Sequence, residues 1–227
     1  RNCIRVQKYW EVAFDQGDVG APIRQEREYL DELHHLLVEA TRLRLRADVP
    51  VGAYLSGGLD SSIIASIVRN HAANRLDTFS ISFSDDRFDE SEFQRCMARY
   101  LQTEHQVVHA THGDIGRVFP DVIWHVETAL MRTSPAPMFL LSRLVKQRGF
   151  KVVLTGEGAD EFLGGYDIFK EMKVRRFWAH QPESKWRHRL LKRLYPDIRE
   201  LSLNSDAFAS AFFGRGLCDT HRWDYSH

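Results

Sequence analysis

Hydrophobic residues in the first two thirds of the chain alternate between helical and strand spacing. Between residues 24 and 46, Leu30, Leu33 and Leu37 recur at intervals of three and four, as on one face of a helix. The same spacing predicts further helices over 61–71, 90–102, 113–125 and 137–148. Short apolar or alternating runs predict strands over 51–55, 78–83, 106–108 and 151–155.

This alternation of strands with helices indicates an α/β fold. Strand–helix–strand units of one hand build a parallel, twisted sheet with helices on both faces. Ligands of such sheets bind beyond the carboxyl ends of the strands. Two predicted strands end in unusual polar sequences, residues 56–62 and 156–165, and we expect the functional site there.

The two ends of the chain differ from this central region. Residues 1–25 contain Gly17, Gly20 and Pro22 and are typical of a linker. Residues 166–195 are predicted to be helical and basic, with nine Lys and Arg residues between positions 170 and 193 against two Glu. Aromatic residues in this stretch could stack on RNA, but a helical packing face with a solvated cationic side is the favoured interpretation.

Composition excludes several classes of protein. The formal net charge of zero gives no overall field that would attract nucleic acid or a membrane surface. No apolar run approaches the roughly 20 residues that span a bilayer. Cys3, Cys96 and Cys218 are too few and too scattered for a disulfide framework or a zinc site. We therefore expect a cytoplasmic globular protein that does not bind membranes.

The first polar sequence is Ser56-Gly57-Gly58-Leu59-Asp60-Ser61-Ser62, between a predicted strand and a predicted helix. Its glycines let the backbone turn sharply and approach a ligand. Its serines supply hydroxyl donors, and the following helix directs its positive end to the same place. Asp60 suits a phosphate site when Mg²⁺ bridges the carboxylate to phosphate oxygens. An anion cradle is favoured over an ordinary glycine turn with a capping residue.

The second polar sequence is a glycine-rich turn that carries Glu157, Asp160 and Glu161. Carboxylates this close together do not ionise jointly unless a cation or a proton is shared. Clustered acids at a strand end therefore indicate metal binding, proton transfer or both. The alternative is a solvated acidic turn that caps a helix, and the anion cradle predicted on the same sheet makes it the weaker one.

These two sequences resemble glutamine-dependent asparagine synthetase, within the ATP-pyrophosphatase superfamily. The loop at 56–62 is similar to the superfamily signature. The narrower resemblance covers about residues 40–180 and rests on four further segments: Ala47–Leu55, Phe88-Asp89-Glu90-Ser91, Thr103-Glu104-His105 and Leu154–Tyr166. The resemblance implies a fold of the adenine nucleotide alpha hydrolase type, with a helical C-terminal extension.

The resemblance also implies roles for individual residues. It places ATP against Leu55, Ser56, Gly57, Gly58, Asp60, Ser61, Ser62, Ile81, Thr155 and Gly156. Asp60 and Asp160 would ligate Mg²⁺. Glu157 would be the catalytic acid of the acyl-adenylate site, and Glu161 and Tyr166 would line the substrate pocket.

The implied reaction is adenylation of a carboxylate by ATP with release of pyrophosphate, followed by attack of ammonia. Aspartate is the leading acceptor, but residues 127–138 match the family's acceptor loop only loosely, so another carboxylate stays open. The implied domains are a linker at 1–25, a synthetase domain at 26–166 and a basic helical extension at 167–227. A glutaminase domain outside the chain would supply ammonia, and a homodimer is possible. The runner-up is a tRNA-modifying ATP pyrophosphatase.

Overall fold

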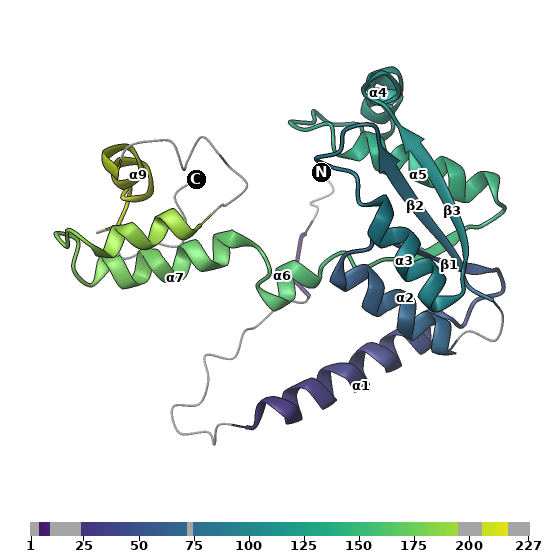
Figure 1. The fold of residues 1–227 in the computed structure, drawn as a ribbon, viewed down its shortest axis with the longest axis horizontal. Coiled ribbons are helices and arrows are strands. Elements are labelled where there is room, and N and C mark those ends of the chain that lie inside the picture. The colour runs from purple at the N-terminus through teal and green to yellow at the C-terminus, as the bar shows by residue number, and fades with distance from the viewer. Residues whose placement is uncertain (1–4, 10–23, 72–74, 195–205, 218–227) are drawn as a thin grey trace.

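A four-stranded parallel sheet forms the centre of the molecule in the computed structural model, which describes residues 5–9, 24–71, 75–194 and 206–217. The strands are β1 (Val51–Tyr54), β2 (Asp77–Phe83), β3 (Glu104–Ala110) and β4 (Val152–Leu154), in the order β3-β2-β1-β4. Since β1 is central and each neighbouring pair is parallel, all carboxyl ends meet at one edge (Figure 1).

Helices cover both faces of this sheet. The helices are α1 (Glu26–Arg44), α2 (Leu59–His71), α3 (Ser91–Leu101), α4 (His112–Val126) and α5 (Pro135–Gln147). Ala53 and Leu55 pack with apolar residues of α2 and α3, whereas Tyr54 packs with α5 on the opposite face. This follows from the alternation of side chains along a strand. The predicted α/β fold, with a parallel sheet between helices, is confirmed.

The C-terminal part forms a helical unit with its own apolar core. It contains α6 (Ala159–Leu163), α7 (Asp167–Ala179), a 3-10 helix η1 (Arg187–Arg193) and α9 (Asp206–Phe213), and α6 joins it to the sheet (Figure 1). Trp178, Leu191 and Phe213 pack together in its core. The predicted helical extension is confirmed, although a turn at residues 180–186 interrupts the helix that we predicted over 166–195.

Several element boundaries differ from those expected. Strand β3 covers 104–110 rather than 106–108, because every residue of β2 from Asp77 to Phe83 pairs with it. Helix α2 begins at Leu59, so that its first turn includes Asp60. Helix α6 was not predicted as an element. Most of the proposed linker at 1–25 lies outside the described residues.

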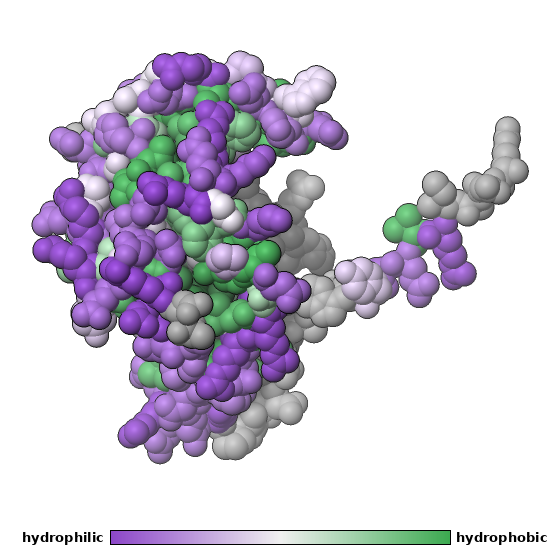
Figure 2. Space-filling view, turned by 90° about the vertical axis from the view of Figure 1, so that its right-hand side faces the viewer, coloured by the Kyte–Doolittle hydropathy of each residue, from purple (hydrophilic) through white to green (hydrophobic). Residues whose placement is uncertain are grey.

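One face of the molecule is mostly polar (Figure 2). Figure 2 shows one face on which hydrophilic side chains predominate, with smaller groups of apolar side chains between them. In the part of the chain that the structure describes, no helix is long and apolar enough to cross a membrane.

Candidate active site

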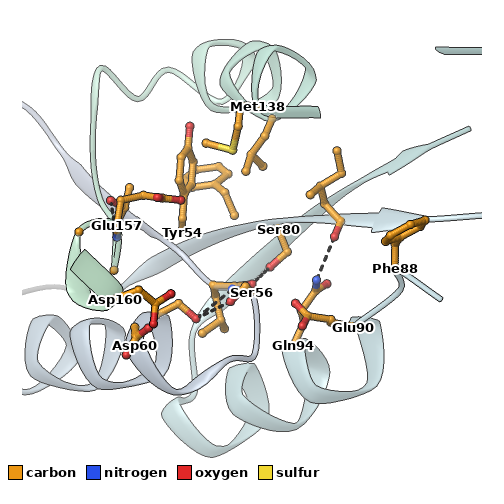
Figure 3. Close-up of a pocket in the computed structure, with 18 of the residues that line it drawn as sticks. Tyr54, Ser56, Asp60, Ser80, Phe88, Glu90, Gln94, Met138, Glu157 and Asp160 are labelled. Carbon is orange, nitrogen blue, oxygen red and sulfur yellow. Dashed lines mark hydrogen bonds between the residues drawn. The ribbon is translucent and has the colours of Figure 1, made fainter. Parts of the chain in front are cut away.

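A cavity of about 250 Å³ opens at the carboxyl ends of β1, β2 and β4. Four segments line it: the loop that follows β1, the second half of β2, the start of α3 and the turn between β4 and α6. Met138 and Leu141 of α5 complete the apolar wall. Figure 3 shows Asp60, Glu157 and Asp160 at one end of this cavity and Phe88 at the other. The two polar sequences therefore belong to a single site.

The loop after β1 is held in shape by its own hydroxyl groups. The Oγ atoms of Ser56 and Ser61 lie 2.8 Å apart, and Ser61 Oγ also donates to the Gly58 carbonyl at 3.2 Å. The backbone N–H groups of Ser56 and Gly58 donate to Ser61 Oγ and Ser56 Oγ, each at 3.2 Å. Because α2 begins directly after this loop, its unpaired first amides face the same region. These bonds fix the loop in one conformation, the arrangement that the predicted anion cradle requires.

Gly57 explains why this loop needs glycine. Its φ of +88° lies in the left-handed region, which other residues rarely adopt. A Cβ at this position would stand 2.7 Å from the Cβ of Phe93 and 2.8 Å from the backbone nitrogen of Gln94. The loop therefore rests directly on α3.

Gly156 brings the second polar sequence against the first. A Cβ added there would stand 2.8 Å from both the carbonyl carbon of Asp60 and the backbone nitrogen of Ser61. These neighbours are backbone atoms at the start of a helix, so they cannot rotate away. The turn after β4 thus packs on the first turn of α2, and this contact sets the distance between the acidic turn and the anion cradle.

Four carboxylates, of Asp60, Glu157, Asp160 and Glu161, line the cavity. Glu161 accepts a hydrogen bond of 3.1 Å from the hydroxyl of Tyr166, and this bond raises the pKa of the tyrosine. Among the described residues, no group of three or more His, Cys, Asp or Glu is arranged to hold a metal. Asp60 and Asp160 both line the cavity, and a Mg²⁺ ion held by two carboxylates would take its other oxygens from a nucleotide and water.

The structure places most of the predicted residues on the cavity wall. Those that line it are Leu55, Ser56, Asp60, Ser61, Ile81, Thr155, Gly156, Glu157, Asp160, Glu161 and Tyr166. Of the residues described, Gly57, Gly58 and Ser62 were also expected at the ligand but are not part of this wall; they shape the loop behind it. Leu55 is only 1% exposed and packs its side chain in the core, so its backbone faces the cavity.

Several wall residues were missed by the sequence reasoning, and the polar side chains of Ser80 and Gln94 are two of them. Ser80 donates a short hydrogen bond to the carbonyl of Leu55, and thereby joins β2 to the start of the loop. Gln94 is 3% exposed, and its Nε2 donates to the carbonyl of Ile81 at 2.9 Å. The sequence does contain a signal for Ser80, because Thr78, Ser80 and Ser82 place polar side chains on one face of an otherwise apolar strand.

The segment Phe88-Asp89-Glu90-Ser91, between β2 and α3, forms a further part of the cavity wall. Asp89 accepts hydrogen bonds from the backbone of Phe83 at 3.0 Å and from the Ser91 hydroxyl at 2.6 Å. These bonds hold the pKa of Asp89 below its usual value, with the Ser91 hydroxyl as the larger cause. The ionised carboxylate thus fixes this segment, which carries Phe88 and Glu90 into the cavity wall.

Comparison with known proteins identifies relatives of this chain. It is 37% identical over 178 residues to a probable glutamine-hydrolysing asparagine synthetase of Dictyostelium discoideum, covering 71% of this chain and 32% of that protein. It is 33% identical over 192 residues to the amidase chyE of Penicillium rubens, covering 78% of this chain and 28% of that protein. An asparagine synthetase of Oryza sativa is 43% identical over 137 residues, with coverages of 56% and 23%.

The chain thus spans a third or less of the length of these relatives. Among solved structures, a phosphoadenylyl-sulfate reductase from Candida auris aligns with a TM-score of 0.33 at 19% identity, covering 60% of this chain and 70% of that one. The sequence profile of the asparagine synthase family matches residues 32–220. The chain therefore belongs to the asparagine synthase family.

Proposed function

We propose that this chain is the synthetase part of an ATP-dependent ligase that forms an amide from a carboxylate and ammonia. The observation that carries the proposal is the contact of Gly156 with the backbone of Asp60 and Ser61. This contact joins an anion cradle and a set of carboxylates around one cavity. Membership of the asparagine synthase family supports the same conclusion.

In the proposed reaction, the cradle holds the β- and γ-phosphates of ATP because they form the leaving group. The backbone amides at the start of α2 and the hydroxyls of Ser56 and Ser61 stabilise the charge of the departing pyrophosphate. Asp60 and Asp160 would hold Mg²⁺, which supplies neutralisation of phosphate charge. Leu55, Ile81, Thr155 and Gly156 surround the nucleoside through backbone and apolar groups, as the family resemblance implies.

The proposed chemistry has two steps. An oxygen of the acceptor carboxylate bonds to the α-phosphorus of ATP as the bond to the β-phosphate oxygen breaks, which gives an acyl-adenylate and pyrophosphate. Ammonia then bonds to the acyl carbon as the carbon–oxygen bond to AMP breaks. Glu157 lies on the cavity wall and is assigned to orient the acceptor and to take a proton from the attacking nitrogen.

Aspartate is the leading acceptor, since several relatives are named asparagine synthetases. Glu161 and the Tyr166 hydroxyl bonded to it would stand beside this acceptor. The relative from Penicillium rubens is named an amidase, so a different carboxylate is the alternative within the same chemistry. We further propose that ammonia comes from a glutaminase domain, that the linker at 1–25 joins the two domains, and that the protein is cytoplasmic and can form a homodimer.

A tRNA-modifying ATP pyrophosphatase is the second candidate, and it would use the basic C-terminal helices to bind RNA. In the structure, at least two of the basic side chains of these helices are already bound to groups of the protein. Arg175 is fully buried and donates to the carbonyls of Phe213 and Arg215. Lys170 pairs with Asp167 at 2.7 Å. This arrangement favours the packing role of the basic stretch over an RNA surface.

A substitution at Glu157 tests the proposed function. The protein is incubated with ATP, Mg²⁺, ammonium and a panel of carboxylates, and AMP, pyrophosphate and amide are measured. We expect Glu157→Gln to keep ATP affinity within about twofold while amide formation falls about 100-fold or more, the lower range for loss of a general base. Glu183→Gln makes the same chemical change at an exposed position outside the cavity and should behave as the wild type. Unchanged amide formation by Glu157→Gln would remove this residue from the mechanism.

A further inference from the structure

A second groove lies at the opposite end of the sheet, where β2 and β3 begin. Its volume is about 1010 Å³, and four arginines line it: Arg69 at the end of α2, Arg75 before β2, and Arg95 and Arg99 on α3. Ala98, Thr103 and His105 are also among its lining residues. Because β2 and β3 are parallel, this groove is separated from the proposed nucleotide cavity by the length of the strands.

Backbone carbonyls accept hydrogen bonds from the Nε atoms of three of these arginines. The Nε of Arg69 donates to the Leu101 carbonyl at 3.1 Å, and the Nε of Arg75 to the Gln102 carbonyl at 3.4 Å. The Nε of Arg99 donates to the Arg95 carbonyl at 3.3 Å. Because only Nε is used in the contacts of Arg69 and Arg99, their two terminal nitrogens are available as a planar fork, the geometry that binds phosphate oxygens in pairs.

The positive charge of the groove is only partly balanced by neighbouring carboxylates, those of Glu104 and Asp89. Arg75 pairs with Glu104. Within the described ranges, Arg69, Arg95 and Arg99 form no ion pair, and no Asp or Glu lines the groove. Burial lowers the pKa of His105, so at neutral pH the charge comes from the arginines. Guanidinium groups gathered with only partial counter-charge repel one another, and a bound anion would relieve that repulsion.

Capping of helix C-termini accounts for only part of this arrangement. Arg69 and Arg99 lie in the last turns of α2 and α3, where cations interact favourably with the helix dipole. Arg95 lies near the middle of α3, away from either end, and nevertheless lines the same groove. Capping explains why Arg69 and Arg99 lie at helix ends but not why four arginines from three segments line one groove.

We propose that this groove binds a small anion with two or more linked phosphate groups, such as pyrophosphate or the polyphosphate of a nucleotide. The guanidinium groups of Arg69, Arg95 and Arg99, which form no ion pair among the described residues, match the charge of such a ligand better than that of a single phosphate. Single-stranded nucleic acid is a poorer match, because it binds by stacking on aromatic rings. Among the described residues that line the groove there is no Phe, Tyr or Trp.

Calorimetric titration with pyrophosphate tests this site. We expect two binding events in the wild type, one at the groove and one at the loop after β1. Arg69→Gln with Arg99→Gln should weaken the groove event at least tenfold and leave the loop event unchanged, which also shows that the variant is folded. Gly156→Ala should weaken only the loop event, so a failure of the proposed nucleotide site is distinguished from a failure of the groove.

Two further variants separate fork geometry from simple charge. Arg69→Lys with Arg99→Lys keeps the charge but loses the forks, and we expect groove affinity to fall roughly three- to tenfold. Arg27→Gln with Arg117→Gln removes the same charge from exposed positions away from the groove and should change nothing. The proposal is overturned if the glutamine pair at 69 and 99 keeps both events, if the control pair loses one equally, or if orthophosphate or a short oligouridylate binds the groove more tightly than pyrophosphate.

Discussion

Replacing Gly156 with alanine tests the contact that joins the two halves of the site. The added Cβ would lie 2.8 Å from two backbone atoms of the first turn of α2, whereas ordinary contact begins at 3.4 Å. The turn and the helix must therefore separate by about 0.6 Å. Insertion of a methyl group into such packing costs about 1–3 kcal/mol. For a chain of this size, that cost lowers the melting temperature by about 2–12 °C.

The same displacement moves Asp160 away from Asp60, because Asp60 lies in the first turn of α2 and Asp160 lies just after the turn that Gly156 begins. We expect Gly156→Ala to weaken ATP binding in the presence of Mg²⁺ by at least tenfold, measured by calorimetry beside a thermal melt. Gly116→Ala is the matched control, since nothing lies within 4 Å of the added Cβ and the position is inside α4. It should leave ATP binding unchanged and stabilise the helix by about 0.5–1 kcal/mol. Wild-type melting and ATP affinity in Gly156→Ala would refute the reasoning.

Three further substitutions test other parts of the structure. Ser80→Ala leaves the carbonyl of Leu55 without its hydrogen-bond donor. We expect the free energy of unfolding, measured by urea titration, to fall by about 1–3 kcal/mol. Arg87→Gln removes the side-chain hydrogen bonds that are the largest cause of the lowered pKa of Asp85, about 2, and keeps the backbone one, so NMR titration should show that pKa rising part of the way towards 3.8. Because the folded-state pKa is the lower one, the stability from this pair is present above about pH 4 and is lost as the pH falls towards 2. Glu171→Ala breaks the buried ion pair with Arg175. We expect the free energy of unfolding, measured by tryptophan fluorescence during denaturation, to fall by about 3–5 kcal/mol.

The sheet and its helices could be predicted from hydrophobic spacing because burial on both faces leaves a clear pattern in each segment. The ends of the strands and helices were harder to predict from the sequence. Strand β3 begins with three polar residues in a row, at 104–106, and its length is set by pairing with β2, which is a non-local effect. Helix α6 has five residues and follows a glycine with a φ of +92°, so it carries too few positions for any period to be read.

The candidate site was predictable where residue type alone carries the chemistry, as in the serines, glycines and carboxylates of the two polar sequences. The walls were harder to foresee. Gln94 lies on α3, whose sequence has the usual pattern of an amphipathic helix and does not mark this position as a site residue. Only the fold brings its amide to the carbonyl of Ile81. The arginine groove was not foreseen either, because Arg69, Arg75 and Arg99 are dispersed along a chain with zero net charge.

The most direct test of the central claim follows an oxygen atom from the acceptor to the nucleotide. The protein is supplied with ATP, Mg²⁺, ammonium and an acceptor whose carboxylate carries ¹⁸O, and the phosphorylated products are analysed by mass spectrometry. Attack on the α-phosphorus followed by loss of AMP predicts one ¹⁸O atom in AMP, together with unlabelled pyrophosphate. Appearance of ADP with ¹⁸O in inorganic phosphate would contradict adenylation and with it the proposed role of the loop as the holder of a pyrophosphate leaving group.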